Sequence, residues 1–394
     1  SYLPFGKKRI MRGLIIMNDK EAREIRRRFK PDKTWINAVH GCYVNESKKV
    51  ISTFRESVQT MVQDESERFL ALLKKPISGT IGRSLINLEF SARQVMESEE
   101  HKLLMAMRAC GLENEELLTA FYNRVAQTLN IDGGYIILLV HDTYSVPYRS
   151  SDGHAQHDAS DEEFSYFICS ICPVKQTQPV LSYQLAENCF NALNNGFAVS
   201  APQLGFMFPA FDNRAANIYA TLYYTKSTAD NHPEFTTAVF GIEPPMPAAS
   251  QKEVFSEILS EALAEECRIE TVQSVQEHIG QIMEMHKENH VEEPLALSKN
   301  ELGAVLGQCG VSAERVQAFS DAFDAHFGTD AALPPVNMID KKQFVITTPE
   351  VTVKVDPERS DMIELRKIDG LKYILIPADD VVEVNGVKVQ FGEK

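Results

Sequence analysis

The residues best suited to acid–base chemistry are a His-Asp pair and an Asp/Arg pair, each following an apolar segment. His141 and Asp142 come directly after the buried strand predicted for Tyr135–Val140, and Asp212 and Arg214 follow an aromatic segment. Catalytic groups are common at strand ends, so these four could serve a metal- or acid–base-assisted hydrolase if they converged in one pocket. The alternatives are a hydrogen-bonded strand end for the first pair, and a helix cap with an ordinary ion pair for the second.

Two histidines have a spacing that metal sites also use. His154 and His157 stand three residues apart in the polar segment 147–160, together with several aspartates. Imidazole and carboxylate groups bind divalent metals, but their sites need rigidly held ligands. The segment has no long apolar run to anchor it, so a solvated loop is the favoured interpretation. We therefore expect no metal and no other cofactor.

A CxxC pair, Cys169 and Cys172, lies inside a predicted strand at 164–174. Alternation along a strand sends the two sulfurs to opposite faces, and the chain has no second CxxC or CxxH to complete a zinc site. Buried, inert thiols are therefore expected. The seven cysteines follow no disulfide framework, which favours a reducing compartment and a cytoplasmic protein.

The segment 17–33 is basic, with seven Lys or Arg residues against four acidic ones. Its cluster Arg26, Arg27 and Arg28 could contact the phosphates of RNA or of a ribosome, or an acidic partner. The alternative is a solvated helix face in which Glu24 and Arg28 form an ordinary pair four residues apart.

Composition excludes several classes of protein. The chain has 394 residues, a formal net charge of −15, 44% hydrophobic residues and 24% charged residues, which is ordinary for a folded protein and unlike a disordered, collagen-like or coiled-coil chain. No apolar run reaches the roughly 18–20 residues that span a bilayer, so no membrane is expected as a partner. A Walker loop, GxGxxG, GxSxG and HExxH are all missing from the sequence, so the mechanisms that use them have no support.

The pattern of apolar segments predicts an α+β protein of several parts. We expect a mixed body, a helical segment, and a small antiparallel β domain with hairpin turns at Asp369-Gly370 and Asn385-Gly386. The boundaries expected for these parts are 17–250, 251–328 and 335–394. Residues 1–16 carry four basic and no acidic residues and are expected to be a translated leader.

A shift of 130 residues aligns parts of the body with each other. Cys42 then matches Cys172, and Ser52 matches Ser182, within a pattern of strand, polar turn and strand. Such patterns also recur by chance. If the match is a duplication, the body has two related halves, at 17–150 and 160–250.

Several segments resemble those of a bacterial family that is known only as a domain of unknown function. They are HGCYVN (40–45), SEEHKLLMAMR (98–108), CSICPVK (169–175), FPAFDNRAANIY (208–219), EPPMPA (243–248) and VDPERSDMIE (355–364). The resemblance covers nearly the whole chain from Met17 and implies no catalytic residues.

Without a coherent catalytic set, a non-enzymatic interaction protein with a protein partner is the favoured function. We expect the scattered histidines, thiols and carboxylates to be ordinary parts of the architecture. Three or more of them around one cavity would contradict this expectation.

Overall fold

The computed structural model describes residues 17–30, 34–149, 155–177, 180–184, 188–193, 196–378, 382–384 and 386–390. These residues form two units: one extends to Ser250 and includes Val291–Pro294, and the other contains Gln251–His290 and the chain from Leu295 onward. Large and small antiparallel sheets combine with helices, which confirms the predicted α+β class. The described helices include none with the length and apolar character that crossing a membrane requires.

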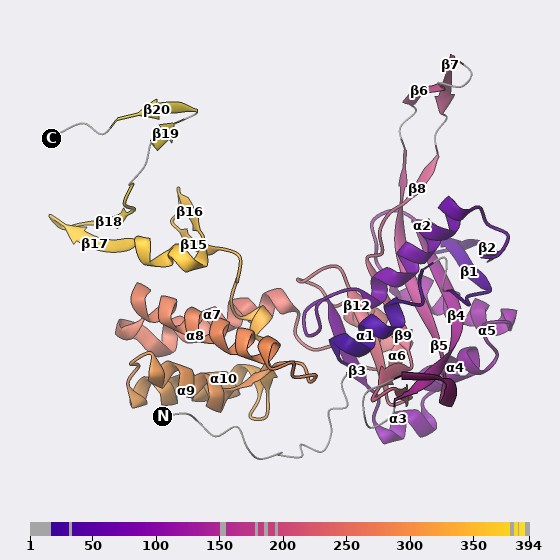
Figure 1. Ribbon diagram of the computed structural model, residues 1–394, viewed down its shortest axis with the longest axis horizontal. Coiled ribbons are helices and arrows are strands. Elements are labelled where there is room, and N and C mark those ends of the chain that lie inside the picture. The colour runs from indigo at the N-terminus through magenta and orange to yellow at the C-terminus, as the bar shows by residue number, and fades with distance from the viewer. Residues whose placement is uncertain are drawn as a thin grey trace. The chain divides into compact units, whose positions relative to one another are not determined.

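The first unit is built on an antiparallel sheet (Figure 1). Its strands, in order across the sheet, are β2 (Val50–Ser57), β1 (Ala38–Val44), β4 (Tyr135–Arg149), β5 (Ala155–Gln176), β9 (Leu204–Phe208), β12 (Ala220–Thr225) and β3 (Leu85–Glu89), with β8 (Phe197–Val199) on the end of β5. Two small hairpins complete the unit, β6 (Val180–Gln184) with β7 (Cys189–Leu193) and β10 (Ala210–Asp212) with β11 (Ala215–Asn217).

Helices cover both faces of this sheet and enclose two separate cores. One face carries α3 (Ala92–Glu97), α4 (Glu99–Ala109), α5 (Glu115–Thr128) and α6 (Pro233–Phe240), and we call it the α4 face. The other carries α1 (Asp19–Arg26), α2 (Gln63–Lys74) and the short η1 (Lys75–Ile77), and we call it the α1 face.

The central strands contribute to both cores by simple alternation. On β5, Phe167 and Cys169 face the α4 side, whereas Tyr166 and Ile168 face the α1 side. Successive side chains of a strand point to opposite faces, so a strand covered on both faces is apolar throughout. This explains why the middle of β4 and β5 has a continuous apolar run.

Helix starts follow the capping pattern of the sequence. Asn18 caps the start of α1 and Ser298 caps the start of α9 (Lys299–Gln308), each with a capping box in which the side chain accepts backbone N–H groups. The segment 92–109 reads as one continuous helix in the sequence but forms two, α3 and α4, because Ser98 has an extended backbone and caps α4 by accepting from the His101 N–H.

The polar segment 147–160 also differs from its expected loop. Strands β4 and β5 continue into it, with Pro147 opposite Ser160 and Tyr148 opposite Gln156. Polar residues are compatible with this strand pairing because the backbone groups bond across the hairpin whatever the side chains are.

The pattern of the 130-residue repeat is not matched by the strand pairing. Strands β1 and β2 form the first hairpin, but β6 pairs with β7 and not with β5.

The second unit packs helices around its own core and ends in hairpins. Its helices are α7 (Ala248–Leu263), η2 (Ala264–Glu266), α8 (Ile269–Glu288), α9 (Lys299–Gln308), α10 (Ala313–Phe327), η3 (Pro335–Asn337) and η4 (Pro357–Met362). Its strands pair as β13 (Leu297–Ser298) with β14 (Ala332–Leu333), β15 (Phe344–Thr347) with β16 (Thr352–Val355), β17 (Glu364–Ile368) with β18 (Leu371–Leu375), and β19 (Val382–Val384) with β20 (Val387–Val389).

The last three hairpins are separate two-stranded sheets and do not join into one. Asp369 and Gly370 have φ values of 49° and 85°, the left-handed turn that the Asp-Gly pair predicts. Gly386 has a φ of 81°, and Asn385 lies outside the described residues.

Candidate functional site

Asp142 lies in a closed polar network under α1. Arg28 contacts it with two nitrogens, Nε at 2.5 Å and Nη2 at 2.9 Å, and the Tyr166 hydroxyl donates to it at 2.8 Å. The Asp142 side chain is 1% exposed. The Arg28 guanidinium also lies 4.9 Å from the centre of the Tyr144 ring. These contacts occupy the carboxylate with partners of its own chain, as a buried charge requires.

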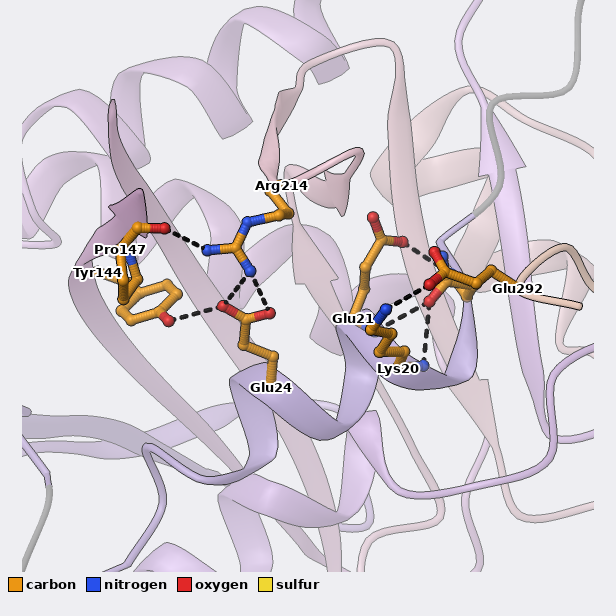
Figure 2. Close-up of polar contacts among 8 residues, drawn as sticks. Lys20, Glu21, Glu24, Tyr144, Pro147, Arg214 and Glu292 are labelled. Carbon is orange, nitrogen blue, oxygen red and sulfur yellow. Dashed lines mark hydrogen bonds and ion pairs between the residues drawn. The ribbon is translucent and has the colours of Figure 1, made fainter. Parts of the chain in front are cut away.

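Arg214 belongs to a second network on the same face (Figure 2). Its Nη1 donates to both carboxylate oxygens of Glu24, at 2.9 and 2.8 Å, and its Nη2 donates to the Pro147 carbonyl at 2.7 Å. The Tyr144 hydroxyl donates to Glu24 at 2.7 Å. Figure 2 also shows the Lys20–Glu292 ion pair farther along α1, whose two side chains are about half exposed.

Asp212 lies near the same helix but contacts neither Asp142 nor Arg214 through a hydrogen bond. Its Oδ2 accepts from Asn217 at 3.3 Å. Burial raises the pKa of Asp212, and burial, with a contribution from the Asp212 charge, raises the pKa of Glu21. The two carboxylates therefore disfavour each other's charge at this end of α1.

His141 lies on the other side of the sheet from its neighbour Asp142. It follows the α4-face residues Ile137 and Leu139 along β4, whereas Leu138 and Val140 belong to the α1-face core. The four residues considered for a hydrolase are therefore not brought together: Asp142 and Arg214 are in two networks under α1, Asp212 is at its edge, and His141 is on the α4 face.

The three arginines at the C-terminal end of α1, Arg26 in its last turn and Arg27 and Arg28 just after it, have different surroundings. Arg28 is bound to Asp142, Arg26 Nη1 lies 3.5 Å from the Ile77 carbonyl, and Arg27 is exposed. Burial lowers the pKa of Arg26. The three do not form one exposed basic surface.

The remaining sequence candidates add little chemistry. His154 lies outside the described residues, and His157 lies on β5 with a side chain outside the described part. Cys169 and Cys172 are free thiols buried in opposite cores, as predicted, and burial raises the pKa of Cys172 to about 12. No group of three or more metal-ligating side chains occurs among the residues with described placement.

An open-sided hollow of about 520 Å³ lies between the C-terminal end of α4 and strands β4 and β5. It is lined by Met105, Arg108, Ala109, Cys110, Gly111, His141, Thr143, Glu163 and Ser165. His141 Nε2 lies 2.9 Å from Ser165 Oγ, and Arg108 Nε donates to the Ser165 carbonyl at 2.7 Å. Burial lowers the pKa of His141, and the nearby Arg108 charge lowers it further, while Asp142 and Glu113 oppose the shift.

This hollow contradicts one expectation from the sequence. A histidine, a thiol and a carboxylate, His141, Cys110 and Glu163, share one cavity, so they are not all scattered parts of the architecture. Sequence reasoning identified His141 but missed Arg108 and Ser165. The available signal was weak, since an arginine in the last turn of a helix is ordinary and no sequence pattern reveals a contact across a separation of 57 positions.

Sequence reasoning also missed His232, which precedes α6. Its side chain is 5% exposed, its φ is 50°, and Nδ1 lies 3.5 Å from Asp230 and 3.6 Å from Glu234. Neither ring nitrogen has a hydrogen-bond partner among the described residues. A histidine directly before Pro233 in a polar segment gave no sign of this burial.

Comparison with known proteins identifies the family but no activity. The model of the family described as "Domain of unknown function (DUF4317)" matches residues 17–387. No match to a curated protein was found. Because the match spans nearly the whole chain, the protein belongs to the DUF4317 family.

Proposed function

We propose that the protein is a non-enzymatic interaction protein that binds a protein partner through a β arm. The arm consists of the end of β5 from Val174 to Gln176, strand β8 and the β6–β7 hairpin. In Figure 1 it extends away from the sheet of the first unit. Its strands use an ordinary antiparallel register, with Val174 opposite Val199 and Tyr183 opposite Phe190.

The observation that carries this proposal is the exposure of large apolar side chains along the arm. The exposed fractions are 69% for Leu181, 46% for Tyr183, 65% for Phe190, 68% for Phe197 and 41% for Val199. Leu181, Tyr183 and Phe190 share one face of the β6–β7 hairpin by their register. A contiguous apolar surface of this kind marks an interaction site more often than single exposed residues do.

The charge of the arm favours a protein over a nucleic acid as its partner. Residues 174–199 contain two charged residues, Lys175 and Glu187, in a chain that is 24% charged. Nucleic-acid binding depends on several Lys or Arg contacts to phosphates. Exposed sheet edges are normally protected by charge, so an apolar edge with few charged residues favours strand pairing with a partner.

The stability of the arm points in the same direction. An isolated two-stranded hairpin is marginally stable in water. β6 and β7 pair with each other and with no other described strand. A partner strand or apolar surface would bury Phe190 and its neighbours and so stabilise the hairpin.

The other two functions suggested by the sequence receive less support. The hydrolase needs His141, Asp142, Asp212 and Arg214 in one pocket, and these lie in different places. The RNA-binding function needs an accessible basic helix, but Arg28 is committed to Asp142.

Site-specific photo-crosslinking in the full chain tests the proposal. A photoreactive residue at Phe190 should give a discrete adduct, and one at Met96, which is 70% exposed on α3, should not. The crosslinked protein is then purified and its affinity for the chain is measured. Because central apolar residues dominate interfaces, Phe190→Asp should weaken binding at least about 30-fold and Met96→Asp should leave it unchanged. Equal adducts at both positions, or binding unaffected by Phe190→Asp, would overturn the proposal.

A further inference from the structure

We infer that the hollow beside α4 binds a small organic molecule through a carboxylate group, with Arg108 as the ionic contact. The inference is independent of the β arm. It rests on the geometry of the hollow, on the hydrogen bonding of Arg108 and on the polar pair His141 and Ser165.

Arg108 is held in place and lacks a carboxylate partner in the described chain. Its Nε donates to the Ser165 carbonyl at 2.7 Å. Ser165 precedes Phe167, the first β5 residue that pairs with β9, where it lies opposite Phe208. No ion pair links Arg108 to any Asp or Glu among the described residues, in contrast to Arg28 and Arg214. Burial lowers the pKa of Arg108, so the guanidinium is partly desolvated without a compensating anion.

The bond from Nε fixes the orientation of the guanidinium. Its two terminal nitrogens then remain to donate to a ligand. Two parallel N–H groups of a planar guanidinium match the two oxygens of a carboxylate, and this pairing is among the strongest in proteins.

His141 and Ser165 supply neutral hydrogen-bonding groups next to this cation. The Ser165 hydroxyl and the His141 Nε2 lie 2.9 Å apart and both line the hollow, so either can turn a donor or an acceptor toward a ligand. The pair also has the spacing of a nucleophile and a base. No carboxylate bonds Nδ1 of His141 within the described residues, so the third group of a catalytic triad is missing there and binding is the better supported role.

The size and charge of the hollow select the ligand class. A volume of about 520 Å³ falls within the range typical of small-molecule sites, and Met105 and Ala109 add apolar surface. The exposed Glu163 lines the same hollow. Arg108 attracts and Glu163 repels an anion in proportion to its charge, so a second negative charge on the ligand brings little net gain and a singly charged carboxylate is sufficient.

NMR of the histidine-labelled full chain tests the inference with sodium butyrate as the probe, at constant ionic strength. The His141 signal is identified by its loss in His141→Gln. The chemical shift of this signal should change saturably with butyrate concentration, with a Kd of about 1–10 mM, as expected for so small a ligand. Bound carboxylate should also raise the pKa of His141, because a nearby negative charge stabilises the imidazolium.

Matched variants separate the site from general ion effects. Arg108→Gln should weaken butyrate binding at least about tenfold, and Arg108→Lys should weaken it less. Arg93→Gln, which removes an exposed arginine paired with Glu97, should leave binding unchanged. Ser165→Ala keeps the backbone carbonyl that Arg108 uses, and should weaken binding by about fivefold even if Arg108→Gln fails to fold.

Three outcomes would overturn the inference. The first is a shift of the His141 signal with sodium chloride that is as large as the shift with butyrate. The second is inorganic phosphate binding more tightly than butyrate, which would make the hollow a phosphate site. The third is unchanged butyrate affinity in folded Arg108→Gln or Ser165→Ala.

Discussion

The two faces of the sheet in the first unit treat their charged groups in opposite ways. On the α1 face, Asp142 and Glu24 are each bound by an arginine and a tyrosine of the same chain. On the α4 face, Arg108 bonds to a carbonyl and has no carboxylate partner among the described residues. A network satisfied by its own chain holds a helix in place, whereas an oriented cation beside a hollow is suited to a ligand. Whether a buried polar residue is available to a ligand therefore depends on which hydrogen-bond and ion-pair partners it already has in its own chain.

The largest expected difference between the faces comes from Asp142. Asp142→Ala leaves the Arg28 guanidinium and the buried Tyr166 hydroxyl without their partner, and should lower the free energy of unfolding by about 3–5 kcal/mol. Thr143→Ala is the matched control, because Thr143 directly follows Asp142 but its side chain is exposed and lines the hollow. It should change the free energy by at most about 0.5 kcal/mol. Urea unfolding measures both, and equal losses would remove the contrast.

The Glu24–Arg214 pair should show a smaller but clear coupling. Its side chains are 15% and 24% exposed, so solvent screens the pair less than a surface pair. A double-mutant cycle with Glu24→Gln and Arg214→Gln, measured by urea unfolding, should give a coupling free energy of about 1–2 kcal/mol. The same cycle on the exposed pair Arg93 and Glu97 should give about 0.3–0.5 kcal/mol. A coupling energy at Glu24 no larger than that at Glu97 would contradict the proposal that the networks on the α1 face hold this helix in place.

Arg108→Gln should affect the other face through electrostatics more than through stability. The substitution loses one hydrogen bond to a backbone carbonyl, so the free energy of unfolding should fall by about 1 kcal/mol or less. The pKa of His141 should rise, because the Arg108 charge contributes to its lowering. An NMR titration measures that pKa. An unchanged value in folded Arg108→Gln would show that the two groups do not interact.

The smallest effect concerns pH and Asp212. Burial raises its pKa above the usual 3.8, so the folded chain holds this proton more tightly than the unfolded chain does. The contribution of Asp212 to stability is thus present at low pH and is lost as pH rises through the raised pKa.

Asp212→Asn should therefore gain stability relative to the natural chain as pH increases from below 3.8, as measured by urea unfolding at several pH values. Glu99→Gln should show the opposite sign, because Lys102 lowers the pKa of Glu99. The same sign for both variants would contradict this interpretation.

Local features of the fold could be predicted from the sequence because short-range physics determines them. The strand, turn and strand pattern of β1 and β2 and the hairpin turn at Asp369 and Gly370 were both predicted. The break at Ser98 was missed, although a serine followed by Glu99 and Glu100 is a typical helix start. In that segment the continuous apolar pattern hid the cap.

Contacts between distant residues could not be predicted in this way. Helix α6 was missed because His232 and Pro233 follow a polar segment that resembles a loop, and its apolar face is recognised only against the core it packs on. The extension of β4 and β5 depends on their mutual pairing. The roles of Asp142 and Arg108 depend on partners 114 and 57 residues away, which no periodicity reveals.

The pairing of β4 with β5 makes the sheet a single layer between the clamped helix and the hollow. His141 and Asp142 are consecutive, as are Ser165 and Tyr166, and each couple sends one side chain to each face. A shift of the His141–Asp142 peptide would move the carboxylate that holds Arg28, and a shift of the Ser165–Tyr166 peptide would move the hydroxyl that donates to that carboxylate. The residues that line the hollow are thus one peptide unit away from those that hold Arg28.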